Sequence, residues 1–146
     1  MISIIQRVTK AEVAVGESVI GTIGQGIMAL VAIEKTDSEK QADRLLERIL
    51  NYRIFADENR KMNLSLRNIN GGLLIVPQFT LAADTEKGNR PSFTSAASPQ
   101  QSQQLFSYLI HRAHKIFPNS QTGRFGADMK VTLTNDGPVT FTLHVK

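Results

Sequence analysis

The sequence predicts an α/β protein in which a mixed β-sheet is covered by two helices on one side. Short segments rich in β-branched residues open and close the chain, and two longer segments carry the apolar spacing of amphipathic helices. A sheet buries an apolar face by packing against such helices, so these elements predict a layered structure. The 146 residues contain no Pro-, Gly- or Ser-rich linker and no repeat, and we therefore expect a single domain from Met1 to Lys146.

The first quarter of the chain is predicted to form strands. Ile2–Val8 is apolar and β-branched, Glu12–Val15 alternates in polarity, and Val19–Ile23 follows a turn signal at Gly16–Ser18. These three segments are typical of a meander or hairpin. The next segment, Ile27–Ile33, is apolar enough to be a strand that is buried on both faces.

A first helix is expected from Ser38 to Arg53. Asp37 or Ser38 is its N-cap, and Ser38 with Gln41 matches the capping-box pattern. The apolar positions follow the i, i+3, i+4, i+7, i+8 spacing of one helix face and are Ala42, Leu45, Leu46, Ile49 and Leu50.

A buried strand and a second helix follow. A polar turn at Asp57–Arg60 and a Gly71–Gly72 break precede the apolar run Leu73–Val76. The second helix is expected over 98–117, because a proline lies in its first turn and another directly follows its end. Its apolar face consists of Leu105, Leu109, Ala113 and Ile116.

The tail of the chain is predicted to be extended again. Strands are expected over Thr122–Phe125, Met129–Thr134 and Val139–Val145, and the last two are separated by Asn135–Pro138. This order of elements suggests a mixed sheet whose second face packs on more sheet or on a partner.

The composition excludes several classes of chemistry. The absence of cysteine excludes disulfides, thiolate metal sites and a cysteine nucleophile, and it fits a reducing compartment, so we expect a cytoplasmic protein. No stretch approaches the roughly 18 apolar residues of a membrane span, and no membrane partner is expected. The formal net charge of +4 helps a polyanion to approach but is common among soluble domains. His111 and His114 lack an obvious third ligand, and we expect neither a metal ion nor a cofactor.

Two segments are unusual on physical grounds. In Val76–Leu81 the strand leaves its buried part through Pro77, which cannot donate to a sheet ladder, and then presents amide, aromatic and hydroxyl groups. This segment is either a strand end with ordinary turn chemistry or a place where backbone groups face a ligand. The second segment is Gly137–Pro138 between two strands, where a plain hairpin turn and a cis peptide bond are the alternatives.

Six motifs follow one another along the chain. They are Ile5-Gln6-Arg7-Val8, Tyr52-Arg53-Ile54-Phe55 with Lys61-Met62-Asn63-Leu64, Gln78-Phe79-Thr80-Leu81-Ala82-Ala83-Asp84, Arg90-Pro91-Ser92-Phe93, Thr122-Gly123-Arg124-Phe125 with Ala127-Asp128-Met129, and Asn135-Asp136-Gly137-Pro138-Val139-Thr140-Phe141. In this order they resemble the D-aminoacyl-tRNA deacylase family over essentially the whole length of the chain. The sequence departs from the family at one position, where Pro77 stands in place of the usual serine.

The resemblance implies a layered, barrel-like sheet and a homodimeric hydrolase that cleaves the ester between a D-amino acid and the terminal adenosine of tRNA. In that family the Gly-Pro bond is cis and enters the pocket of the other subunit, and Arg7 would hold this motif in place. The implied site residues are Gln78, Phe79 and Thr80 as the catalytic group and Gly137, Pro138, Met129 and Arg7 as the substrate-binding group. Candidate phosphate contacts are Arg60, Lys61, Lys87, Arg90, Arg112 and Lys115.

Specificity and chemistry are then expected to depend on backbone groups. D and L isomers carry the same groups, so a rigid main-chain wall separates them by steric exclusion, whereas achiral glycine passes. Glycyl-tRNA mischarged on tRNA(Ala) is therefore an expected second substrate. Water activated by the 2′-hydroxyl of the substrate, with N–H donors near Phe79 and Thr80, is favoured over Thr80 as a covalent nucleophile. A deacylase with a different preference, such as glycyl-tRNA, and a non-catalytic tRNA-binding or oligomerising module are the alternatives.

Overall fold

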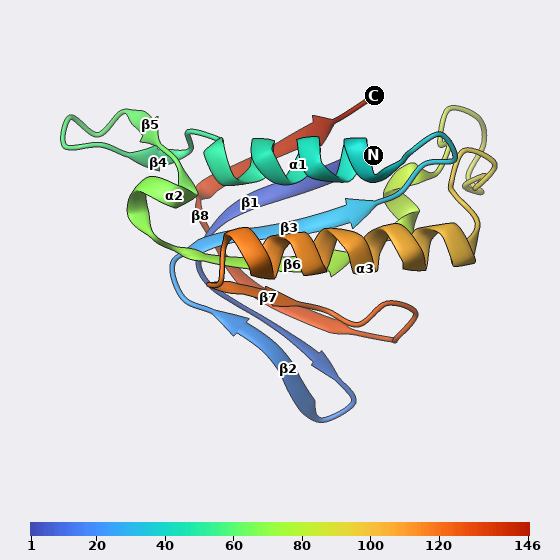
Figure 1. Ribbon diagram of the computed structural model, residues 1–146, viewed down its shortest axis with the longest axis horizontal. Helices are drawn as coiled ribbons and strands as arrows, with labels where there is room; N and C mark the ends of the chain where they lie inside the picture. Colours follow the sequence, from blue (N-terminus) through green and yellow to red (C-terminus); the bar gives the residue numbers. More distant parts are fainter.

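The computed structural model describes residues 1–146 and has a mixed six-stranded sheet with two long helices packed on one face (Figure 1). The sheet order is β2-β1-β3-β6-β7, and β8 pairs with β1 along its other edge. The strand β1 pairs antiparallel with β2, β3 and β8, whereas β3, β6 and β7 are parallel. The strands are β1 (Ile2–Val15), β2 (Ser18–Ile23), β3 (Gly26–Ala32), β6 (Gly72–Pro77), β7 (Ser120–Thr122) and β8 (Lys130–His144).

Both predicted helices are confirmed, with ends that differ by a residue or two. The helix α1 (Glu39–Asn51) is capped by Ser38, whose N–H donates to the Gln41 side chain at 3.0 Å. The helix α3 (Pro99–Ile116) begins after Ser98, whose Oγ accepts the Gln101 N–H at 3.2 Å. Such caps satisfy backbone groups that have no partner inside the helix. All five predicted apolar positions of α1 are buried.

Two apolar clusters lie on opposite faces of the sheet. The larger cluster joins α1 and α3 to β1, β3 and β6, and it contains Leu45, Ile49, Leu73, Ile75 and Leu109. The smaller cluster lies where the sheet curls, and there the first half of β8 covers the other face. Of the two alternatives for the second face, more sheet or a partner, more sheet therefore covers this part of it. The curl makes the sheet barrel-like and leaves room for a cavity at one end of the small cluster.

The predicted breaks in the first and last strands are wrong. Ile2–Val8 and Glu12–Val15 belong to one strand, because β8 pairs with β1 along both halves. Met129–Thr134 and Val139–Val145 are likewise one strand from Lys130. Both halves pair with β1 and not with each other, so the segment between them is a bulge in a long strand and not a hairpin turn. The predicted strand Thr122–Phe125 is also wrong beyond Thr122, because β7 ends at this residue.

Four short elements were not predicted, namely β4 (Phe55–Ala56), β5 (Met62–Leu64), α2 (Leu66–Ile69) and the 3-10 turn η1 (Phe79–Ala82). The strands β4 and β5 form a hairpin around the predicted polar turn. The Asp57 carboxylate accepts the N–H groups of Asn59 and Lys61 and the side-chain amide of Asn63 at 2.7–2.9 Å. These hydrogen bonds, the one from Asn63 above all, lower the pKa of Asp57 below its usual value. None of the helices combines the length and apolar character that crossing a membrane requires.

Candidate active site

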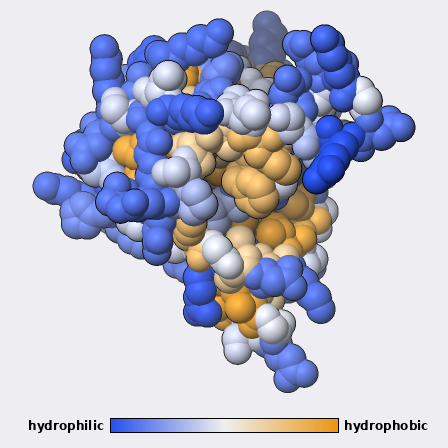
Figure 2. Space-filling view, turned by 90° about the vertical axis from the view of Figure 1, so that its right-hand side faces the viewer, coloured by the Kyte–Doolittle hydropathy of each residue, from blue (hydrophilic) through white to orange (hydrophobic).

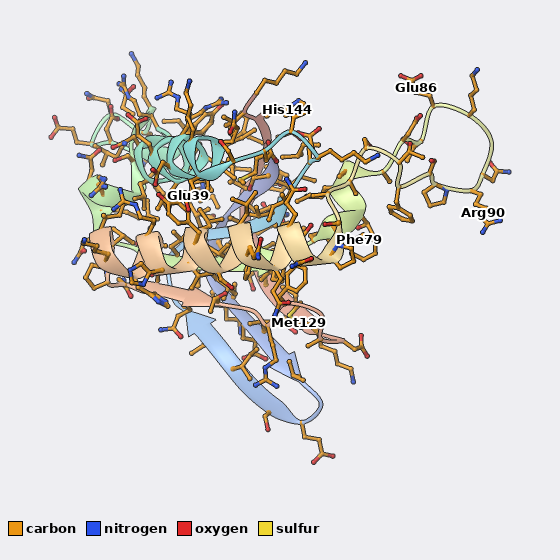
Figure 3. All side chains as sticks on the ribbon, turned by 45° about the vertical axis from the view of Figure 1, so that its right-hand side comes forward. Glu39, Phe79, Glu86, Arg90, Met129 and His144 are labelled. Carbon is orange, nitrogen blue, oxygen red and sulfur yellow. The ribbon has the colours of Figure 1, made fainter.

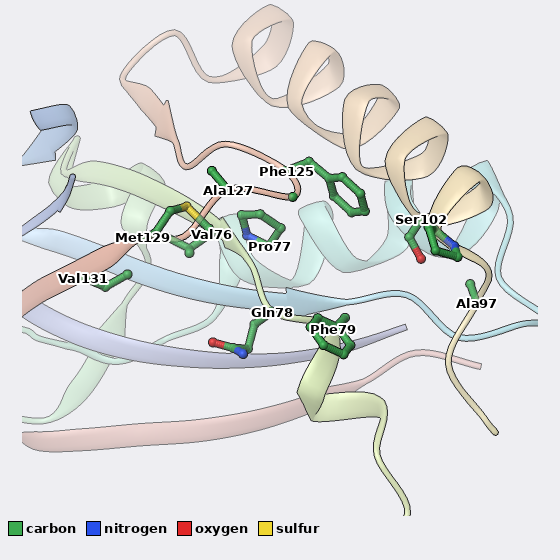
Figure 4. Close-up of a pocket in the computed structure, with 12 residues that line it drawn as sticks. Val76, Pro77, Gln78, Phe79, Ala97, Ser102, Phe125, Ala127, Met129 and Val131 are labelled. Carbon is green, nitrogen blue, oxygen red and sulfur yellow. The ribbon is translucent and has the colours of Figure 1, made fainter. Parts of the chain in front are cut away.

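A cavity of about 460 Å³ opens at the carboxyl end of β6, on the side where apolar side chains gather at the surface (Figures 2 and 4). Its walls come from the end of β6, the following turn, the start of α3, the loop after β7 and the start of β8. Most of its lining is apolar, and none of the lining side chains is charged. The lining residues are Val76, Pro77, Gln78, Phe79, Ala97, Pro99, Ser102, Phe125, Gly126, Ala127, Met129 and Val131.

Pro77 ends the buried strand and turns the chain towards the cavity. It lies opposite Val31 in the parallel pair, and its missing N–H costs no hydrogen bond to β3. The bond at this position comes from the next residue, because the Gln78 N–H donates to the Val31 carbonyl at 2.7 Å. The sequence left two interpretations of this segment, a plain strand end and a place that faces a ligand. They are compatible, because the end of the strand also forms a wall of the cavity.

Of the three predicted catalytic residues, Gln78 and Phe79 line the cavity, whereas Thr80, which follows them in the turn η1, does not. Gln78 Nε2 donates to Thr80 Oγ1 at 2.6 Å, and both Phe79 and Thr80 are exposed. The first hydrogen bond of the turn runs from the Leu81 N–H to the Gln78 carbonyl, so the N–H groups of Phe79 and Thr80 precede it. No histidine or carboxylate is hydrogen-bonded to the Thr80 hydroxyl that would activate it as a nucleophile.

Met129 lines the cavity beside Val76 and Pro77 and is held by the loop after β7 (Figure 4). Its sulfur accepts the Arg124 N–H at 3.3 Å. A Cβ on Gly123 would lie 2.9 Å from this sulfur and 3.2 Å from Pro77 Cδ, so only glycine lets the loop approach β6 this closely. Figure 3 shows Phe79 and Met129 on the same side of the molecule, near the start of α3.

The Gly137–Pro138 peptide bond is cis, and both residues are exposed on the bulge of β8. Arg7 holds the bulge, because its Nε donates to the Asp136 carbonyl at 3.1 Å while Nη1 donates to the Ile54 carbonyl at 2.7 Å. The Asn135 side chain closes the bulge, accepting the Val139 N–H at 2.7 Å. Gly137 has φ +128°, a left-handed region that favours glycine.

The bulge does not reach the cavity of its own chain. The strand β3 lies between β1 and β6 and measures their separation along the sheet. Arg7 of β1 pairs with Ile27 of β3, whereas Pro77 of β6 pairs with Val31, four residues further along. Four residues of extended strand span about 13 Å, and neither Gly137 nor Pro138 lines the cavity. The structure therefore brings Gln78, Phe79 and Met129 together in one chain and leaves Arg7 and the Gly-Pro pair at a separate place.

The sequence did not identify the wall formed by α3 and the loop after β7. Ser102 lines the cavity and is buried on the same helix face as Leu105 and Leu109. The signal that could have identified Ser102 is a polar residue within the apolar stripe of a helix. Phe125 was part of a motif but was not assigned a role, and its ring packs against Phe106 at a centroid distance of 6.2 Å.

The other candidates from the sequence have structural roles or lie apart from the cavity. The Arg112 Nε donates to Asp43 at 3.0 Å between α3 and α1, and this hydrogen bond raises the pKa of Arg112. Lys87 and Arg90 share an exposed loop with two carboxylates, and Figure 3 shows this loop extending away from the body. His144 Nε2 lies 2.7 Å from Glu34 at the sheet surface. No group of three or more His, Asp or Glu side chains is arranged to hold a metal ion.

The fold is that of the tRNA deacylases. A solved structure described as "Structural Analysis of a probable eukaryotic D-amino acid tRNA deacylase" superposes with a TM-score of 0.85 at 16% identity and covers 97% of both chains. Another, "c-Myc DNA Unwinding Element Binding Protein", has a TM-score of 0.95 at 36% identity, covering 100% of this chain and 99% of that one. The curled mixed sheet with two helices on one face thus places the protein in this class of α/β fold.

The chain belongs to the D-Tyr-tRNA(Tyr) deacylase family, whose model matches residues 4–144. It is 57% identical over 145 residues to the D-aminoacyl-tRNA deacylase of Nitrosococcus oceani, covering 99% of this chain and 94% of the relative. It is 54% identical over 146 residues to the enzyme of the same name from Hahella chejuensis, with both chains fully covered. The protein is therefore an enzyme, and the reading as a non-catalytic module is wrong.

Proposed function

We propose that this protein hydrolyses D-aminoacyl-tRNA to free D-amino acid and tRNA, and that it acts as a homodimer in the cytoplasm, where charged tRNA is used. The observation that carries this proposal is that an uncharged cavity is lined by Gln78 and Phe79 and adjoins a turn in which the N–H groups of Phe79 and Thr80 precede the first hydrogen bond. Such groups suit a reaction in which negative charge develops on a carbonyl oxygen.

In the proposed reaction, water adds to the ester carbonyl carbon and the bond from this carbon to the 3′-oxygen of the terminal adenosine breaks. The 2′-hydroxyl of the substrate relays the proton of the water to the leaving 3′-oxygen. The N–H groups of Phe79 and Thr80 stabilise the oxyanion. The Thr80 hydroxyl positions the Gln78 amide, and its lack of a base argues against a covalent ester on Thr80.

Chirality would be read by the Gly137–Pro138 bulge of the second subunit. The bulge is exposed and held by Arg7, and it lies about 13 Å along the sheet from the cavity of its own chain. A partner's main chain entering the cavity would bind the α-ammonium group and leave no space for an L side chain. Glycine has no side chain to exclude, so we include glycyl-tRNA mischarged on tRNA(Ala) among the substrates.

Deacylation of D-tyrosyl-, L-tyrosyl- and glycyl-tRNA by the purified protein tests this proposal. We expect rapid loss of the D-tyrosyl and glycyl esters and persistence of the L-tyrosyl ester. Equal loss of both tyrosyl enantiomers would contradict the filter. Hydrolysis of the glycyl ester alone would support the rival deacylase with a different substrate preference.

Mixed dimers test whether the filter acts between subunits. Ala127→Phe fills the cavity but keeps the bulge, whereas Gly137→Val disturbs the bulge, since a Cβ there would lie 2.7 Å from Val139 Cγ2. We expect neither homodimer to be an active and selective deacylase. Co-refolding the two variants creates one site with an intact cavity and an intact partner bulge, so selective D-ester hydrolysis should return. Absence of recovery in verified heterodimers would refute an intersubunit filter.

A further inference from the structure

A groove of about 450 Å³ runs beside the cavity described above, between α3 and the end of β7 with the residues that follow it. The two depressions share Phe125, so a chain that leaves the cavity past this ring enters the groove directly. Its lining combines apolar and polar side chains. The groove is lined by Phe106, Ser107, Ile110, His111, His114, Thr122, Gly123, Arg124 and Phe125.

The groove carries cationic and N–H donor side chains but no carboxylate. His111 and His114 lie one turn apart on α3, and Arg124 belongs to the opposite wall. All three are exposed, and Arg124 forms no ion pair with an acidic side chain. Three other surface depressions mix both signs of charge, for example Lys10 with Glu12. An uncompensated arginine with two imidazoles in a concave surface is suited to an anion.

We propose that this groove binds the phosphodiester backbone of the unpaired nucleotides that precede the terminal adenosine of the tRNA. The inference rests on the proposed function, which puts the aminoacyl ester in the adjoining cavity. The strand must then leave the cavity, and the wall at Phe125 is the point at which the groove adjoins it. The Arg124 guanidinium fits a phosphate with two parallel N–H bonds, and each imidazole supplies a further donor. The aromatic and apolar side chains that line the groove can stack against the face of any nucleotide base.

Such a groove would give the uncharged cavity a means of positioning different aminoacyl esters. The amino acid differs between the proposed substrates, D-tyrosyl- and glycyl-tRNA, but the unpaired end of the tRNA does not. Binding energy from the constant, non-reacting part of a substrate can position the reacting ester. Arg124 and the histidines are thus assigned to tRNA binding, and Lys87, Arg90 and Arg112 lie outside this groove.

The test compares two substrates that share the ester but differ in phosphate. One is D-tyrosyl-tRNA, and the other is the D-tyrosyl ester of adenosine, which lacks any phosphodiester. The variants are Arg124→Ala and His111→Ala, and the control is Arg44→Ala. Arg44 is an exposed arginine of α1, and the opposite face of α3 packs towards α1 through Tyr108 and Arg112. The control therefore removes the same charge away from the groove.

We expect the ratio of kcat/KM for the tRNA ester to that for the adenosine ester to fall about 5-fold in Arg124→Ala, as the loss of one exposed ionic contact predicts. His111→Ala should lower the same ratio, and Arg44→Ala should leave it unchanged. Binding of uncharged tRNA, measured by fluorescence anisotropy at several salt concentrations, should lose about 0.7 from its log–log salt slope in Arg124→Ala.

An unchanged ratio and an unchanged salt slope in Arg124→Ala would overturn the assignment, and so would an equal loss in Arg44→Ala. If the wild-type protein hydrolyses neither ester, the proposed function is wrong. The salt slope for uncharged tRNA then decides separately whether the groove binds the RNA backbone.

Discussion

Replacing Arg7 by methionine removes a guanidinium that joins the Gly-Pro bulge to the rest of the fold, while keeping much of the apolar stem. Two hydrogen bonds are lost, to the carbonyls of Asp136 and of the buried Ile54, together with an ion pair of 3.3 Å to the Asp136 carboxylate. A hydrogen bond from a charged donor contributes about 1.5–3 kcal/mol. Because the Arg7 side chain is only 15% exposed, we expect a total loss of about 3 kcal/mol and a Tm lower by about 6–12 °C.

The assay is thermal unfolding together with kcat/KM for D-tyrosyl- and L-tyrosyl-tRNA. We expect the ratio of the two kcat/KM values to fall towards one, because Arg7 positions the bulge and lies away from the cavity. Arg53→Met is the matched control, since Arg53 also donates two hydrogen bonds, both to Asn63, but is exposed. Arg7→Lys keeps the positive charge but lacks the planar set of guanidinium donors, so its Tm should lie between those of the wild type and Arg7→Met. A Tm and a D/L ratio as little changed as in Arg53→Met would refute the reasoning.

Three further outcomes are expected. Thr80→Ala should lower kcat less than about 10-fold, because it removes one neutral hydrogen bond from Gln78, and near-complete loss in a rapid-quench assay would instead indicate a covalent nucleophile. Gly123→Ala should lower the free energy of unfolding in urea by about 1–3 kcal/mol and raise KM, because the new Cβ would lie 2.9 Å from the Met129 sulfur. The control Gly24→Ala should show neither effect, because no atom lies within 4 Å of a Cβ at that position. Asp57→Asn should lower the Tm at neutral pH. The folded state lowers the pKa of Asp57, so its contribution is fully present above about pH 4, and the difference between variant and wild type should shrink as the pH falls from there through the lower pKa of the folded state.

The local elements could be predicted where the chain itself carries the periodicity. The apolar stripe of α1 and the proline near the start of α3 depend only on neighbours a few residues apart, and both helices were predicted within about two residues of their ends. Strand boundaries depend on the partner strand. The bulge at Gly137–Pro138 looked like a hairpin turn because nothing in the sequence says that both flanking halves pair with β1.

The sequence by itself determined that the protein is α/β, and it carried the six motifs that match the deacylase family, because these are properties of residue order. Only the tertiary structure decided which of those motifs meet. Gln78 and Met129 are about 50 residues apart and face one cavity because the sheet curls, whereas Arg7 and Gly137 are brought together about 13 Å away by the antiparallel register of β1 and β8. Ser102 lines the same cavity for the same reason, since packing distance, and not spacing along the chain, determines which side chains can act on one substrate.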